Sequence, residues 1–88
     1  MTAVPLDDIT ATLTGLAAAE FGLPAAELSP DLDLASVEGA DSVKVLRVIA
    51  LIERTYDIEL EDEQVFAFKT IRDVSEAVAA AIAKRGVQ

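Results

Sequence analysis

The sequence predicts an all-α fold: a small four-helix bundle, with three main helices, a short third helix and a long loop between the first two helices. Apolar residues recur at three- and four-residue steps in several segments, and no segment shows the alternation of a strand. The 88 residues suit one domain, which we place over residues 1–88. Hydrophobic residues make up 52% of the chain and aromatic residues only 5%, so the core must be mainly aliphatic.

The first helix is expected from about Pro5 to Phe21. Proline suits a first helical turn, and Gly22 can end the helix in a left-handed conformation. The apolar stripe of this helix is predicted to contain Leu6, Ile9, Leu13, Leu16 and Ala17.

A long connection follows from Gly22 to Ala40. It contains Pro24, Pro30 and Gly39, and its segment PAAEL is predicted to form one short helical turn. Connections of this length in compact domains are often functional. Four of its apolar side chains are expected to point inward and hold it against the helices: Leu28, Leu32, Leu34 and Val37.

The second helix is expected from Asp41 or Ser42 to about Tyr56, with two different faces at about 100° per residue. The core face is predicted to contain Val45, Ile49, Ile52 and Tyr56, flanked by Leu46 and Val48. The exposed face is predicted to contain Val43, Lys44, Arg47, Ala50, Leu51 and Arg54. Three of the seven cations of the chain thus share one face. That face is either an ordinary solvated surface or a docking surface for a partner, with charges that steer the encounter.

Two further helices are expected after it. A short helix over Asp62–Ala67 has acidic residues at its positive end. The last helix begins after Thr70, because Thr70 and Asp73 have the spacing of a capping box, and Lys84 and Arg85 suit its negative end. Its buried stripe is predicted to contain Ile71, Val74, Ala77, Val78, Ala81 and Ile82.

Composition excludes several classes of function. A net charge of −9 argues against nucleic acid as a partner. Without Cys or His the chain lacks a thiolate, the usual general base and the commonest metal ligands, so we expect no catalytic residue and no metal site. No apolar run approaches the roughly 20 residues of a membrane span, and the N-terminus lacks a basic secretory start. We therefore expect a cytoplasmic protein that does not bind membranes, and we further expect a monomer that is not an enzyme.

The stretch GADSV, residues 39–43, precedes the second helix. Ser42 has no neighbouring base, and Lys44 points away from it on a helix, so a nucleophilic role is not expected. A helix cap is the simplest role for Ser42. An attachment point for a phosphodiester is the other, because the first turn of a helix offers unpaired N–H groups to an anion. The spacing alone leaves both roles open.

The chain resembles the acyl carrier protein family over nearly its whole length. GADSV is similar to the family signature Gly-x-Asp-Ser-Leu, with Val43 in the place of Leu. LIERTYDIELEDE resembles the segment that joins the second and third helices, and FKTIRDV resembles the segment before the last helix. The resemblance implies that Ser42, flanked by Asp41, carries 4′-phosphopantetheine derived from coenzyme A. Acyl or aminoacyl groups would then travel as thioesters on that arm.

The resemblance also implies partners: a phosphopantetheinyl transferase, a loading enzyme for acyl or aminoacyl groups, and a downstream synthase or transferase. Many fatty-acid carriers present acids where this chain has Lys44, Arg47 and Arg54. We therefore expect a specialised polyketide, nonribosomal peptide or related pathway, with acidic or apolar docking surfaces on the partners. Asp41 before Ser42 favours acyl cargo, since peptidyl carriers more often have Gly-Gly-x-Ser.

Alternatives remain at the level of sequence. The same exposed face could serve an unmodified helical interaction module that keeps the carrier fold. The absence of linker-like tails favours a discrete carrier over a domain cut from a larger synthase. The apolar interior is interpreted as the core of the bundle and not as a shelter for cargo.

Overall fold

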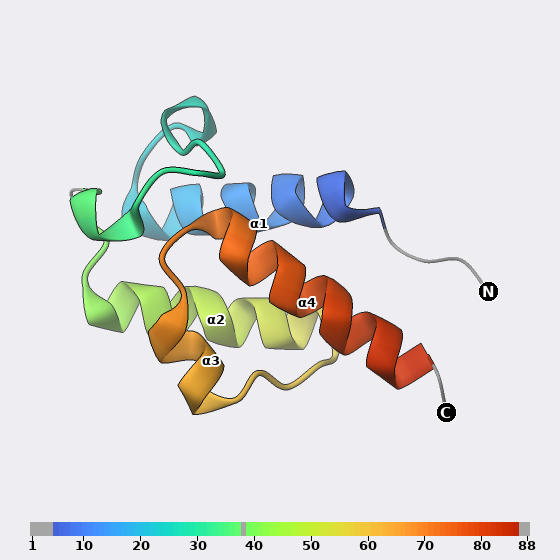
Figure 1. The fold of residues 1–88 in the computed structure, drawn as a ribbon. Coiled ribbons are helices and arrows are strands. Elements are labelled where there is room, and N and C mark those ends of the chain that lie inside the picture. Colours follow the sequence, from blue (N-terminus) through green and yellow to red (C-terminus); the bar gives the residue numbers. More distant parts are fainter. Residues whose placement is uncertain (1–4, 38, 87–88) are drawn as a thin grey trace.

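The computed structural model describes residues 5–37 and 39–86, which are helical apart from their connections (Figure 1). The described elements are α1 Leu6–Phe21, η1 Ala25–Glu27, η2 Leu34–Ser36, α2 Ser42–Tyr56, α3 Asp62–Ala67 and α4 Ile71–Gly86. The four predicted helices are confirmed, as is a helical turn in PAAEL, while the 3₁₀ turn η2 was not predicted. Residues 1–4, 38 and 87–88 of the predicted 1–88 domain lie outside the described part.

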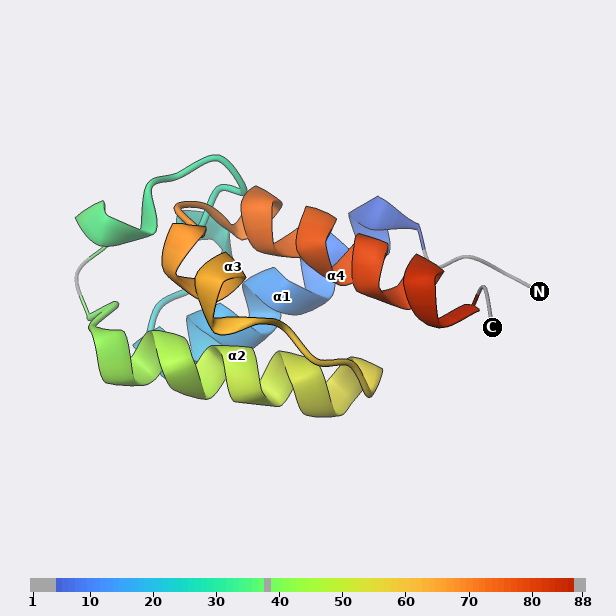
Figure 2. The same cartoon turned by 60° about the horizontal axis from the view of Figure 1, so that its bottom comes forward.

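The three long helices form the bundle. Helix α1 packs against both α2 and α4, and the short α3 lies beside α2, on the path of the chain toward α4 (Figure 1 and Figure 2). None of the described helices combines the length and apolar character that a bilayer span requires.

The core is built from one aliphatic stripe of each long helix. Ile9 and Leu13 of α1, Ile52 of α2 and Val78 of α4 are at most 1% exposed. Ser75 is also fully buried, but its hydroxyl donates a 2.9 Å hydrogen bond to the Ile71 carbonyl, so its burial leaves no polar group unpaired.

Two predicted core positions are wrong. Leu6 is 37% exposed, because it lies in the first turn of α1 and helical side chains lean toward the N-terminus, here beyond the end of the helix. Leu46 is 52% exposed. It lies on the side of α2 that faces α3, and a helix of six residues covers too little of that side to bury it.

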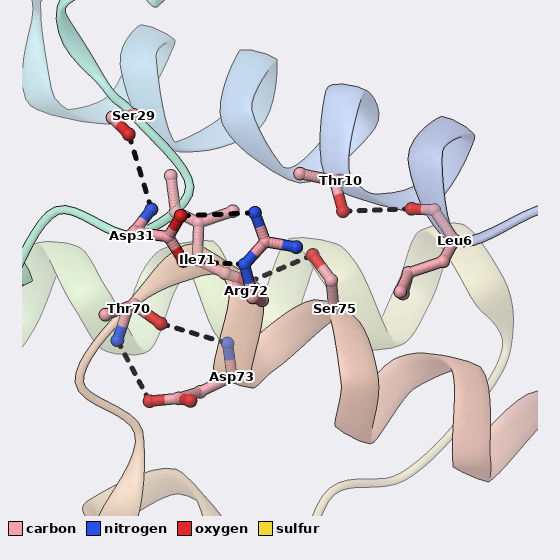
Figure 3. A network of polar contacts seen from close by, with 9 residues as sticks. All are labelled: Leu6, Thr10, Ser29, Asp31, Thr70, Ile71, Arg72, Asp73 and Ser75. Atoms are coloured by element: carbon pink, nitrogen blue, oxygen red, sulfur yellow. Dashed lines mark hydrogen bonds and ion pairs between the residues drawn. The ribbon is translucent and has the colours of Figure 1, made fainter.

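The long loop between α1 and α2 is fastened to the start of α4 (Figure 3). The Arg72 guanidinium donates two hydrogen bonds to the Asp31 carboxylate, at 2.6 and 3.2 Å. The Arg72 backbone N–H donates to the Pro30 carbonyl at 2.9 Å, and the Leu34 N–H donates to the Lys69 carbonyl at 2.8 Å. The predicted inward side chains are confirmed: Leu28 is buried, and Leu32, Leu34 and Val37 pack against the core.

The ends of the helices follow the predicted signals, with one addition. The Asp73 N–H donates to Thr70 Oγ1 at 3.1 Å and the Thr70 N–H donates to Asp73 Oδ2 at 3.2 Å, which confirms the capping box (Figure 3). Arg85 lies in the last turn of α4 as expected. Its guanidinium, however, donates to the carbonyls of Tyr56 and Asp57 at 2.8 and 2.6 Å, so it stabilises the negative end of α2.

Replacing Asp31 with Asn is expected to lower the thermal unfolding temperature at neutral pH. The hydrogen bond from Arg72 lowers the pKa of the Asp31 carboxyl below its usual 3.8. A carboxylate with a lowered pKa stabilises the fold above the pKa of the unfolded chain, and this contribution is lost as the pH falls through the folded pKa. The difference between wild type and Asp31→Asn should therefore shrink as the pH falls below about 3.8. A difference that stays constant through this range would contradict the assignment.

Candidate functional site

Ser42 is the first residue of α2, and its side chain is exposed. The preceding residue, Asp41, is the N-cap: its Oδ1 accepts a 2.9 Å hydrogen bond from the Lys44 N–H. The structure therefore assigns the capping role to Asp41. Of the two roles considered for Ser42, helix cap and attachment point, the first belongs to its neighbour. The Ser42 hydroxyl has no hydrogen-bond partner among residues 5–37 and 39–86.

The chain has four serines, and the other three use their hydroxyls within the fold. Ser36 Oγ donates to the Asp33 carbonyl at 2.7 Å, and Ser75 is buried and bonded to Ile71. Ser29 Oγ accepts the Asp31 N–H at 3.4 Å (Figure 3). Among the four serines, all of which lie within the described residues, Ser42 alone combines exposure with an unengaged hydroxyl.

Gly39 fixes the path of the chain into α2. Its φ of 89° lies in the left-handed region, and a Cβ at this position would approach the Phe21 carbonyl oxygen at 3.2 Å. Only glycine adopts this turn without strain so close to the end of α1. The turn holds Asp41 and Ser42 beside the C-terminal end of α1.

A cavity of about 340 Å³ lies next to Ser42, between α2, α3 and the long loop. Its walls include Leu34 of the loop, Leu46 of α2 and Phe66 of α3. Ser42 is the only residue with a polar side chain that the described part of the chain contributes to these walls. The interior was interpreted as core, and many wall residues do belong to the core, but they leave this apolar space beside the serine.

The outer face of α2 is largely as predicted. Val43, Arg47, Ala50, Leu51 and Arg54 are exposed, whereas Lys44 is half-buried. Arg47 forms a 3.7 Å ion pair with Glu20 of α1. A shallow groove on the α1 side of this face is lined by Glu20, Arg47, Ala50, Leu51 and Arg54.

Two exposed apolar residues were missed as part of the site: Leu46, and Phe66, which is 82% exposed. The signal for Phe66 was present in the sequence. Val65 of α3 and Phe68, which directly follows α3, are partly buried against the core, and Phe66, about 100° from Val65 around the helix, lies at the edge of that inward side. No group of three or more acidic, His or Cys side chains within residues 5–37 and 39–86 is placed to hold a metal ion.

Comparison with known proteins gives the family. Residues 11–78 match a family model described as a phosphopantetheine attachment site. The acyl carrier protein of Streptomyces coelicolor is 35% identical over 68 residues, which cover 77% of this chain and 74% of that protein. The chain belongs to the acyl carrier protein family. Acyl carrier protein 2 of Pseudomonas aeruginosa is 28% identical over 67 residues, which cover 76% of this chain and 85% of that protein.

Membership of the acyl carrier protein family defines the class of activity and the cofactor. Proteins of this family are carriers and not enzymes, and the cofactor of the matching domain is phosphopantetheine. The fold agrees with that of the HMG-ACPI domain from the CurA module of Lyngbya majuscula, solved by NMR, with a TM-score of 0.80. That match covers 98% of this chain and 86% of the other at 19% identity. The predicted all-α bundle is thereby confirmed.

The capping role of Asp41 can be separated from its charge. Asp41→Ala should lower the free energy of unfolding by about 1 kcal/mol, because the Lys44 N–H loses its acceptor. Asp41→Asn should cost much less, since an amide oxygen accepts the same hydrogen bond. Urea unfolding of both variants measures the difference. Equal losses in the two variants would show that the carboxylate charge, and not the cap, stabilises this end of α2.

Proposed function

We propose that the hydroxyl of Ser42 is the attachment point of a 4′-phosphopantetheine arm. The observation that carries this proposal lies at the start of α2. Asp41 caps the helix there, and the exposed Ser42 hydroxyl is left without a hydrogen-bond partner among the described residues. The GADSV stretch places this serine where the family signature has its own, and family membership supplies the cofactor.

Attachment is a transfer of a phosphopantetheine group from coenzyme A. The Ser42 oxygen forms a bond to the phosphorus that bears pantetheine, and the anhydride P–O bond breaks. Adenosine 3′,5′-bisphosphate leaves with the electron pair of that bond. The chain has no His, and Lys44, two residues on along the helix, points away from Ser42. The transferase must therefore remove the hydroxyl proton.

The surroundings of Ser42 fit such an arm. A phosphodiester on the first residue of α2 lies at the positive end of a 15-residue helix, where unpaired backbone N–H groups favour an anion. None of the described residues that line the apolar cavity beside Ser42 carries a charge, so no side chain there repels the phosphodiester. When bound, the arm supplies the thiol that this chain lacks, and that thiol holds acyl cargo as a thioester.

The outer face of α2 supports a more specific place for this carrier. Arg47 and Arg54 give it a positive charge on a protein of net charge −9. We take this face to dock acidic surfaces of the loading enzyme and of a downstream synthase, in a polyketide, nonribosomal peptide or related pathway. The acyl class of cargo follows from Asp41 before Ser42. Residues 1–88 would act as one monomeric carrier domain in the cytoplasm.

Intact mass after incubation with coenzyme A and a broad-specificity phosphopantetheinyl transferase tests the attachment. Wild type and Ser36→Ala should each gain one phosphopantetheine group, and Ser42→Ala none. Ser36 is the matched control because it is also exposed and lies in the same part of the chain. A gain of mass in Ser42→Ala would show that the group is attached to another residue. No gain in wild type, beside a carrier that is modified, would favour an unmodified interaction module.

The docking face is tested by a single charge reversal. Arg54→Glu should slow acylation of the modified protein by the loading enzyme of its pathway, by roughly tenfold at low ionic strength. Lys84→Glu is the matched control, since Lys84 is also an exposed cation in the last turn of its helix. Equal rates for the two variants at low salt would show that α2 does not steer this partner.

A further inference from the structure

The chain from Ser29 to Asp41 leads to the proposed attachment serine and buries little of itself. None of its described side chains is fully buried. Four apolar side chains of this segment are partly buried against the core: Leu32, Leu34, Val37 and Ala40. Segments with few buried apolar contacts open locally at a low free-energy cost. The position of Ser42, which directly follows the segment, therefore depends on the polar contacts that hold the segment in place.

Backbone hydrogen bonds join this segment to the start of α4 and lead from there to α2. The Leu34 N–H donates to the Lys69 carbonyl, two residues before α4, at 2.8 Å. The Val37 N–H donates to the Leu34 carbonyl at 3.1 Å, and the Ala40 N–H donates to the Val37 carbonyl at 3.2 Å. Asp41, the next residue, is the cap of α2. We call the two consecutive turns, from Leu34 to Val37 and from Val37 to Ala40, the entry turns.

Arg72 fastens the chain just before the entry turns (Figure 3). Its guanidinium donates to both carboxylate oxygens of Asp31, at 2.6 and 3.2 Å, and its backbone N–H donates to the Pro30 carbonyl at 2.9 Å. Exposed ion pairs contribute little to global stability, but two parallel hydrogen bonds fix the orientation of both groups. Neither Asp31 nor Arg72 lines the cavity beside Ser42. Any effect of the geometry of this pair on the serine must therefore pass through the chain between them.

We propose that Asp31 and Arg72 are positioning residues for the modification of Ser42. This inference rests on the proposed attachment. The ion pair holds the chain against α4, the entry turns connect that fixed point to the cap of α2, and Ser42 follows the cap. When the pair is lost, a larger fraction of the molecules has open entry turns at any moment. A transferase that binds the closed arrangement then binds more weakly, in proportion to the fraction of molecules that have it.

The first test compares two arginines of α4 in the reaction of the full chain with coenzyme A and a broad-specificity phosphopantetheinyl transferase. Arg72→Gln should raise the KM for this carrier about threefold and leave kcat close to that of wild type, because a saturating concentration of the carrier restores full occupancy of the transferase. Arg85→Gln is the matched control, since it removes the same charge, two hydrogen bonds and an ion pair at the other end of α4. Its KM should equal that of wild type. Equal KM values for the two variants would contradict the positioning role.

The second test is a double-mutant cycle on the ion pair. Arg72→Gln makes the net charge of the chain more negative and Asp31→Ala makes it less negative, so an effect of net charge would shift KM in opposite directions. Loss of positioning should instead raise KM in both variants. The double variant should be no worse than either single variant, since the two side chains act as a unit. Opposite shifts, or effects that add in the double variant, would contradict the assignment.

Amide hydrogen exchange tests the entry turns without a transferase. In Arg72→Gln the N–H groups of Leu34, Val37 and Ala40 should exchange about threefold faster than in wild type. The N–H of Val78, which lies in the buried stripe of α4, should exchange at the wild-type rate. In Arg85→Gln the entry turns should exchange as in wild type. Faster exchange at Leu34 alone would show that the entry turns do not connect the ion pair to α2, and would overturn the proposal.

The outcomes separate the positioning role from the attachment. Normal modification of wild type, with an unchanged KM in both Arg72→Gln and Asp31→Ala, overturns the positioning role and leaves the attachment intact. Failure to modify wild type overturns the attachment, and the positioning role with it. Circular dichroism shows whether each variant is folded, which is expected because both side chains are exposed. If one variant is unfolded, the other member of the pair decides the test.

Discussion

The burial of one aliphatic stripe from each long helix is the constraint on which this structure depends. Ile9, Leu13, Ile52 and Val78 are almost wholly removed from water, and burial of this kind is the main favourable contribution to folding. With few aromatic residues in the chain, the core fills only when α1, α2 and α4 pack closely. Each helix needs only one face to fill the core, so the outer face of α2 and its N-terminal end remain at the surface.

The loop between α1 and α2 positions Asp41 and Ser42 at the start of α2. The contacts of Asp31 and Leu34 with the start of α4 hold the loop against the bundle, and Gly39 turns the chain sharply beside the end of α1. The cap on α2 then comes from Asp41. Ser42 is consequently held at a fixed position, on the wall of an apolar cavity, while its hydroxyl stays open to solvent.

The distribution of charge is as informative as the serine. A chain of net charge −9 keeps its exposed α2 cations on one side of Ser42 and the exposed acids of α3 on the other. A carrier must meet several enzymes in turn at one short segment. Like charges disfavour a wrong orientation of a partner and opposite charges favour a matching one, so this distribution bears on which partner surfaces the segment can meet.

The sequence by itself determined the features that depend on neighbours in the chain. The bounds of α2 and α3, the capping box of Thr70 and Asp73 and the exposure of Arg47 and Arg54 follow from periodicity and local hydrogen bonds. Tertiary structure alone decided the rest: the exposure of Leu46, the contact of Arg85 with the end of α2, and the cavity beside Ser42. Periodicity shows which way a side chain points from its helix. Whether it is buried depends on how far a neighbouring element extends, and the six-residue α3 is too short to cover Leu46.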